Sequence, residues 1–446
     1  MYNKLFFLLI IFISNQVFAI NPKPGGNFGV DSRTIQAFSL PMKELTKKQL
    51  TDFMVGNSLF RSNWVMSPAS VTKLQGLGPT FIARSCSSCH QNDGRSRPND
   101  NGETGVGLLF RISVTKNNKD FYHDPVYGDQ IQTNSIMNVL NEGETHVEYE
   151  ELKNKFADGE EYSLLKPKYT IKNLNYGEFD GIVVISPRVA PAVIGMGLIE
   201  AISVADILQN ADPDDKDNDG ISGRPNYIEV GGKKMIGRFG WKANQPSLND
   251  QDAGALLGDM GITSKKNPIQ NCSKTQSHCN LAHNAGVEMN DEDFRRLVFY
   301  TAILGVPKSR IDNPEAIAKG EALFNKIDCM KCHVPDFVTG KNKVKQFSRQ
   351  TISPYSDFLL HDMGEGLADN RPDYEANGRE WKTPPLWGIG LTKVVNRHMR
   401  LLHDGRARGI EEAILWHGGE ASKSVEKYKM LNKEDRKTLI QFVESL

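Results

Sequence analysis

Apolar residues recur at intervals of three and four in several segments, as expected for helices that bury one face. These segments are residues 42–60, 291–304, 314–325 and 433–446. Between residues 146 and 175 the pattern changes to short alternating stretches, separated by Asp158-Gly159 and by Pro167, which is typical of strands. Loops rich in glycine and proline join these segments. The pattern predicts a mainly α fold with loop-rich connections and a small β insertion.

The N-terminus has the three parts of a secretory signal peptide. Lys4 precedes an apolar run over residues 5–13, and Val17-Phe18-Ala19 provides a cleavage site after Ala19. The run is shorter than the 18 or so apolar residues that a membrane span requires, and the later apolar stretch at 181–208 is broken by charges and prolines. We therefore expect residues 1–19 to be removed and the rest to be periplasmic, without stable membrane insertion.

Length and charge limit the remaining choices. A chain of 446 residues has room for two or three domains, and its 54 basic residues balance its 54 acidic ones. Because there is no basic excess, nothing points to a nucleic-acid partner. We expect two domains, at residues 20–289 and 290–446.

The motif C-x-x-C-H occurs twice, at residues 86–90 and 329–333. Two cysteines at this spacing form thioethers to the two vinyl groups of a haem, and the adjacent histidine binds its iron. Zinc would need four ligands at each site, and a redox C-x-x-C pair would need a βαβ context that the pattern lacks. The sequence predicts two covalent haem c groups, attached through Cys86, Cys89, Cys329 and Cys332, with His90 and His333 as iron ligands.

The second motif has the context of a small cytochrome. The stretch 320–324 precedes Cys329 as the entry helix does in a class I cytochrome c, and the helix near Phe442 resembles the closing helix. Two cysteines remain, Cys272 and Cys279. In an exported protein they favour a disulfide; the alternative is a metal site with His278 and His283.

Beyond the motifs, most of the mature chain resembles the bacterial di-haem oxidoreductase family, whose members are often labelled peroxidases or thiol oxidoreductases. The later part is distantly similar to di-haem cytochrome c peroxidases and to di-haem enzymes that oxidise tryptophans on a partner protein. The matching stretches are residues 186–191 with 195–202, 219–224, 237–242, 361–364, 381–387, 402–406 and 412–420. The resemblance implies two cytochrome c-like haem domains and an oxidoreductase activity.

The resemblance also suggests the sixth iron ligands. In the relatives, a stretch like 383–386 and then 403–405 precedes a helix whose Met or Tyr binds the second haem, and His417 occupies that place here. This implies a His333/His417 pair, with Met363 as the alternative. For the haem of His90 the sequence offers His123 or His146, but an open or weakly held site is preferred. Two imidazoles set a lower potential than His/Met, which suits a haem that stores or delivers electrons.

Other residues are candidates for supporting roles. Glu200, in an apolar stretch that would raise its pKa, is the candidate acid/base for breaking the peroxide bond. Asp215, Asp217 and Asp219 have the spacing of a calcium loop, although Asn226 replaces the usual Glu at the twelfth position. Three arginines are candidates to pair with haem propionates, or are simply surface charge: Arg188, Arg238 and Arg406. Four tryptophans are candidates to carry electrons between the haems, or are simply packing residues: Trp241, Trp381, Trp387 and Trp416.

We therefore expect an exported di-haem cytochrome c peroxidase. Hydrogen peroxide or a similar small oxidant would react at the N-terminal haem. The C-terminal haem would pass or store electrons from an exported donor or protein substrate. Two alternatives stay open: a non-catalytic electron carrier with two six-coordinate irons, and an accessory of metal acquisition.

Overall fold

The computed structural model describes residues 20–99, 102–103, 105–282 and 286–446. The predicted signal peptide, 1–19, and His283 lie outside the described residues. The helices are α1 (Lys47–Arg61), α2 (Cys86–Cys89), α3 (Met196–Glu200), α4 (Val204–Leu208), α5 (Leu248–Met260), α6 (Ser277–Ala282), α7 (Asp291–Ile303), α8 (Pro314–Lys326), α9 (Thr392–Asn396), α10 (Ile410–Trp416), α11 (Ser422–Lys429) and α12 (Lys433–Ser445).

The strands form several small antiparallel sheets of two or three strands rather than one large sheet. They are β1 (Thr80–Phe81), β2 (Gly102–Glu103), β3 (Leu108–Thr115), β4 (Phe121–Tyr122), β5 (Asn134–Ser135), β6 (Glu144–Lys155), β7 (Glu161–Lys172), β8 (Ile182–Val189), β9 (Tyr227–Val230), β10 (Lys233–Ile236), β11 (Phe337–Val338), β12 (Thr351–Ile352), β13 (Leu360–Asp362) and β14 (Glu380–Lys382).

The prediction of a mainly α fold is wrong. The structure is 30% helix and 20% strand, which makes it a mixed fold. Many of the strands are only two to four residues long, and such strands leave no alternating pattern to recognise in the sequence. The predicted β insertion is present as the long hairpin of β6 and β7, but β3 and β8 form a second sheet that the pattern missed.

The longer helices begin where the sequence provides N-caps. Thr46 and Gln49 form a reciprocal capping box at α1, and Asn290, Asn313 and Asn432 accept backbone N–H groups at the starts of α7, α8 and α12. These side chains satisfy amide groups that the helix itself leaves unpaired. For this reason the predicted segments at 291–304, 314–325 and 433–446 differ from the observed helices by one residue at most.

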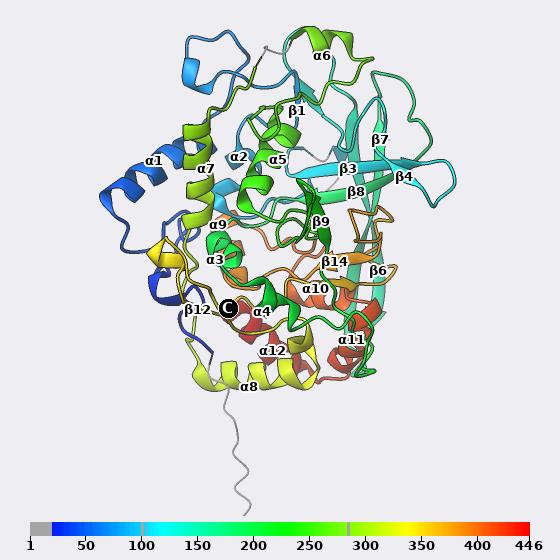
Figure 1. Ribbon diagram of the computed structural model, residues 1–446. Helices are drawn as coiled ribbons and strands as arrows, with labels where there is room; N and C mark the ends of the chain where they lie inside the picture. The colour runs from blue at the N-terminus through cyan, green and yellow to red at the C-terminus, as the bar shows by residue number, and fades with distance from the viewer. Residues whose placement is uncertain (1–19, 100–101, 104, 283–285) are drawn as a thin grey trace, which may run out of the picture.

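Two helix pairs organise the molecule (Figure 1). α1 packs against α7 in the upper part of the view, and α8 packs against α12 in the lower part. Each pair crosses at a glycine, because a Cβ on Gly56 would lie 2.3 Å from the carbonyl oxygen of Arg296, and one on Gly320 would lie 2.4 Å from that of Thr438. Each pair builds one of the two large hydrophobic clusters of the core.

The hairpin of β6 and β7 connects the two parts along the right side of Figure 1. Its tip carries Phe156, which is buried in the core cluster of α8 and α12. The guanidinium of Arg436, on α12, lies 3.8 Å from the centre of the Phe156 ring and forms ion pairs with Asp158 and Glu160. The tip of the β6–β7 hairpin therefore packs on the C-terminal part and is paired to it by charge.

Candidate functional site

Both C-x-x-C-H motifs fold as a single tight helical turn. The first forms α2 and the second a 3-10 turn, Cys329–Lys331. In each, the histidine amide donates to the carbonyl of the first cysteine at 2.9 Å, His90 to Cys86 and His333 to Cys329. The turn brings both cysteines and the histidine together, as attachment of one haem requires.

The six cysteines divide as the sequence predicts. Cys272 and Cys279 form a disulfide, which confirms that prediction over the metal site with His278 and His283. The four motif cysteines form no disulfide. They are therefore available for thioether bonds to two haem groups.

Three histidines share one anchoring arrangement. The Nδ1–H of His90 donates to the carbonyl of Pro191 at 2.8 Å, that of His333 to Tyr355 at 2.9 Å, and that of His417 to Ala413 at 2.7 Å. Because a carbonyl only accepts, this bond leaves the lone pair on Nε2. An imidazole fixed in this way is the usual form of an iron-binding histidine.

Burial supports the same conclusion for these rings. It lowers the pKa of His333 to about 4, and it lowers the pKa values of His90 and His417 as well. Each ring is therefore neutral at pH 7 and able to bind a metal ion. His417 also contributes to the lowered pKa of His333, which is consistent with two imidazoles that share one site.

Each motif histidine is also packed against an aromatic pair from the two crossing helices. The ring of His90 lies 5.9 Å from that of Phe60, which contacts Tyr300 on α7. The ring of His333 lies 5.9 Å from that of Phe324, which contacts Phe442 on α12. The helical surroundings of a small cytochrome, predicted for the second motif alone, therefore occur at both.

A cavity of about 290 Å³ lies at the second motif. Its lining includes Cys329, Cys332, His333 and His417, together with Met363. The structure thus brings the two predicted imidazole ligands to one cavity, and it also places the alternative ligand there. His417 follows α10, whose carbonyl at Ala413 fixes its ring, whereas Met363 follows the short strand β13.

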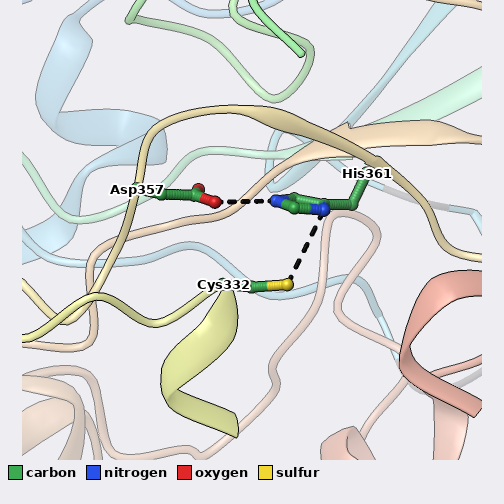
Figure 2. Close-up of side chains that lie close together, drawn as sticks. All are labelled: Cys332, Asp357 and His361. Atoms are coloured by element: carbon green, nitrogen blue, oxygen red, sulfur yellow. Dashed lines mark hydrogen bonds and ion pairs between the residues drawn. The ribbon is translucent and has the colours of Figure 1, made fainter. Parts of the chain in front are cut away.

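Beside Cys332 is a buried charged cluster that the sequence did not reveal (Figure 2). His361 bonds through Nε2 to Asp357 at 2.8 Å and through Nδ1 to Glu420 at 2.7 Å, and its Nδ1 is 3.6 Å from the sulfur of Cys332. Although burial acts to lower the pKa of His361, Asp357 and the other bonds raise it well above the usual range. An imidazolium between two carboxylates results.

The surroundings of the first motif are different. His123 is exposed near Asp129, and His146 lies on β6 with its Nε2 3.5 Å from Glu144. Neither is on the helices that surround His90. Helix α5 approaches the motif instead, with Met260 Sδ 4.0 Å from Cys86 Sγ. No side chain among the described residues is identified as a second ligand here, and the open site stays a prediction.

Glu200 lies at the end of α3 and is exposed, whereas the sequence suggested an apolar environment. Its carboxylate accepts a hydrogen bond from the amide of Leu248 at 2.8 Å, at the start of α5. Its catalytic role stays a prediction, because this bond is also what a simple helix cap would make.

The arginines predicted to pair with propionates have different partners. Arg188 is ion-paired to Asp373 at 3.0 Å and Arg406 to Asp404 at 2.6 Å. Arg238 lines the cavity, donates to three backbone carbonyls and has a buried Nε without a partner among the described residues. Arg238 therefore has a buried N–H group that is free to donate to a bound anion.

Two further cations line the cavity and were missed by the sequence analysis. Arg95 donates to the carbonyls of Arg400 and Leu402, and Lys382 lies 5.9 Å above the ring of Phe358. Burial lowers the pKa of Lys382 to about 8. With Arg238, these cations suit the carboxylates of a propionate-bearing ligand, so the cavity fits a haem on the basis of its thiols, imidazoles and cations together.

Three of the four predicted tryptophans line the cavity: Trp241, Trp381 and Trp387. Trp381 stacks on His403, with ring centres 3.8 Å apart, and the ammonium of Lys242 lies 4.6 Å from its centre. Trp416 packs under Arg406. An electron-carrying role for any of them stays a prediction.

The predicted calcium loop brings its carboxylates together. One oxygen from each of Asp215, Asp217 and Asp219 lies within 4.8 Å of the others. Asp219 also accepts a bond from the ammonium of Lys331 at 2.6 Å, and thus contacts the second motif directly. Calcium at this loop stays a prediction.

Among the described residues, no helix combines the length and apolar character needed to cross a membrane.

No curated protein matches the chain. Among solved structures, hydrazine synthase of Kuenenia stuttgartiensis, pressurised with 20 bar xenon, is similar with a TM-score of 0.34 and 13% identity, over 92% of this chain and 98% of that chain. A family model matches residues 23–446. On that match, the chain belongs to the family described as "Di-haem oxidoreductase, putative peroxidase".

Proposed function

We propose that the protein is an exported di-haem cytochrome c that reduces hydrogen peroxide or a similar small oxidant. One haem is attached covalently through Cys86 and Cys89 and the other through Cys329 and Cys332. The proposal is carried by one difference between two otherwise similar motifs, which is the presence or absence of a second anchored histidine beside the motif histidine. His333 has a second anchored imidazole, His417, in its cavity, whereas His90 does not have one among the described residues.

When bound, the N-terminal haem supplies a ferric iron with an accessible position for the oxidant. In the reaction the oxygen–oxygen bond breaks, two electrons and two protons are taken up, and two water molecules leave. An exported donor or protein substrate provides the electrons. His90 would bind the iron through an imidazole that the carbonyl of Pro191 fixes in orientation.

The C-terminal residues have a different task. His333 and His417 line one cavity and would both bind the second iron, and a haem held in this way would store or deliver electrons. Arg238, Arg95 and Lys382 place positive charge along the cavity wall, where they bind propionates. The buried cluster of Asp357, His361 and Glu420 fixes the adjacent chain beside Cys332.

Electron paramagnetic resonance of the ferric holo protein, with optical spectra before and after one equivalent of hydrogen peroxide, tests this proposal. We expect one high-spin and one low-spin iron, and a change at the high-spin iron on adding peroxide. Two low-spin irons that do not react with peroxide in the ferric or half-reduced protein would instead show an electron carrier.

The acidic loop is proposed to bind calcium next to the C-terminal motif. Asp215, Asp217 and Asp219 provide the carboxylate oxygens that calcium prefers. Calcium that binds only the folded state raises the unfolding temperature by mass action. We expect this rise in the wild type and not in Asp217→Asn, whereas an equal response of both proteins would remove the loop from the proposal.

A further inference from the structure

Helix α5 forms one side of the N-terminal haem site. Asp252, Leu256 and Met260 follow one another at intervals of four residues and therefore share one face of the helix. Met260 contacts Cys86 at 4.0 Å, which directs this face toward the attachment site. The carboxyl of Asp252 also contributes to the raised pKa of the Cys86 thiol, after the larger effect of burial. Asp252 is thus a carboxyl group close to the first motif.

The carboxyl of Asp252 is held on one side and free on the other. The hydroxyl of Thr301, on α7, is 2.7 Å from Asp252 Oδ2 and also 3.0 Å from the carbonyl of Val298. Oδ1 has no hydrogen-bond partner within the described part of the chain. The residue keeps some exposed surface, although its carboxyl group lies among packed protein atoms. One oxygen therefore stays free for a small molecule.

This arrangement accommodates both protonation states without movement of heavy atoms. When Asp252 is ionised, the Thr301 hydroxyl donates to it. When Asp252 is protonated, its own proton is donated to the Thr301 oxygen, and the hydroxyl proton turns to the carbonyl of Val298. A carboxyl that keeps a partner in both states is suited to take up and release a proton.

Burial, together with a neighbouring charge, brings the pKa of Asp252 into the working range. Burial raises the pKa to about 7, against the lowering effect of the Thr301 bond, and the carboxylate of Glu200 raises it further. The groups that face this pair are Cys86 on α2 and Arg238, whose charge acts on Glu200. A general acid/base works best when its pKa lies near the operating pH.

We propose that Asp252 is the catalytic residue that transfers a proton between the two oxygens of the oxidant at the N-terminal haem. Its carboxylate would accept the proton from one oxygen of the peroxide, and the resulting carboxyl would donate it to the other oxygen, which leaves as water when the oxygen–oxygen bond breaks. The electrons come from the exported donor. Glu200 is a positioning residue, which caps α5 through Leu248 and acts on Asp252 by its charge. This inference rests on the proposed open site at His90.

Cyanide binding to the ferric holo protein tests the assignment without turnover. Hydrogen cyanide must lose its proton to bind iron, so a base beside an open site accelerates binding. Stopped-flow spectra from pH 5 to 9 would give the rate constant for association. We expect Asp252→Asn to lower it about 100-fold and to remove the pH dependence near 7. Haem content and the low-spin signal of the second iron would show that the variant is folded.

Two further variants separate the roles. Glu200→Gln is expected to keep fast association and to shift its pH profile downward, because a negative neighbour of Asp252 is lost. Asp252→Glu, which keeps a carboxyl, is expected to recover part of the rate. An unchanged profile in Asp252→Asn, or a loss in Glu200→Gln alone, would overturn the assignment. Absence of cyanide binding in the wild type would overturn the open site itself, and the assignment with it.

Discussion

The two haem motifs have the same scaffold and different surroundings. At each, a helix pair crosses at a glycine, an aromatic ring lies 5.9 Å from the motif histidine, and a backbone carbonyl fixes that histidine. The C-terminal motif adds a second anchored imidazole and a compensated buried charge cluster. The N-terminal motif has instead the carboxyl group of Asp252, whose pKa burial raises and which has a single hydrogen-bond partner among the described residues.

We infer that haem attachment and access of small molecules to the iron are determined by different residues. Both halves have the motif turn and the helix crossing, which we propose hold the haem. In the proposed function, access to each iron depends on segments distant from the motif, at residues 410–417 in one half and 248–260 in the other. Variants in these segments should therefore change one site and leave the other intact.

The largest effect is expected for His417→Ala. Removal of this imidazole leaves the second iron with His333 alone, so its low-spin signal should be lost completely while both haems stay attached. Paramagnetic resonance of the ferric protein measures the change. His123→Ala, an exposed histidine, is the control and should leave both signals as they are.

A variant of Met363 is needed to interpret a low-spin signal that persists in His417→Ala. It lines the same cavity, so Met363→Leu should keep the low-spin signal if His417 is the ligand. Loss of the signal in Met363→Leu, together with its persistence in His417→Ala, would transfer the ligand role to the thioether.

The contacts between the tip of the β6–β7 hairpin and α12 should stabilise the C-terminal half selectively. Phe156→Ala removes a buried ring from the core of α8 and α12 and from beneath Arg436, which is expected to cost about 3 to 5 kcal/mol. Denaturant unfolding followed by the low-spin signal measures this loss. Phe121→Ala, on the half-exposed strand β4, is the matched control with a smaller effect.

The selectivity is the critical part of that result. The high-spin signal of the first iron should disappear at its original denaturant concentration. If both signals moved together by the same amount, the two halves would unfold as one unit, and the hairpin would not distinguish them.

The buried cluster at Cys332 is expected to contribute somewhat less. Asp357→Asn leaves His361 without one of its carboxylates, and the loss of one member of a buried ion pair costs about 3 kcal/mol. Because the folded pKa of His361 is raised above its unfolded value, its contribution is complete below pH 6.5 and is lost as pH rises through the folded pKa.

Thermal unfolding of the holo protein between pH 6 and 10 checks the sign. In Asp357→Asn the pKa of His361 falls, so the loss of stability should begin at a lower pH than in the wild type. Asp362→Asn, which removes a half-exposed partner of Arg379, is the control. Parallel curves for wild type and Asp357→Asn would show that His361 does not titrate.

The sequence could predict those features that depend on residues close to one another along the chain. The two attachment motifs, the disulfide and the capped helices depend on residues within about a dozen positions of one another, so spacing alone was sufficient. The proton-transfer candidate was different. Asp252 is defined by Glu200 and Thr301, each about fifty positions away, and no local pattern marks it.

The resemblance to the family identified regions whose role only the structure explains. The stretch at 186–191 ends at Pro191, whose carbonyl fixes His90. The stretch at 361–364 begins at His361, and 412–420 contains both His417 and Glu420. The pocket cations Arg95 and Lys382 were missed because a charged side chain resembles surface charge until its burial is known.

The smallest expected effect concerns the two residues between the motif cysteines. The first motif has Ser87 and Ser88 there, whereas the second has Lys331, whose ammonium is paired with Asp219 of the acidic loop. This pair is partly exposed, so Lys331→Gln should cost about 1 kcal/mol or less and the difference should shrink in high salt. Thermal unfolding in a chelator, with and without added sodium chloride, measures it.

The pH dependence of this small difference identifies its source. Although burial acts to raise the pKa of Asp219, the bond from Lys331 lowers it below the usual value of 3.8. The contribution of the pair is therefore present above that value and is lost as pH falls through the lowered pKa. Wild type and Lys331→Gln should become equally stable in acid, whereas Ser88→Gln in the other motif should show no such convergence. A difference that persisted in acid would place the effect of Lys331 in packing, not in its charge.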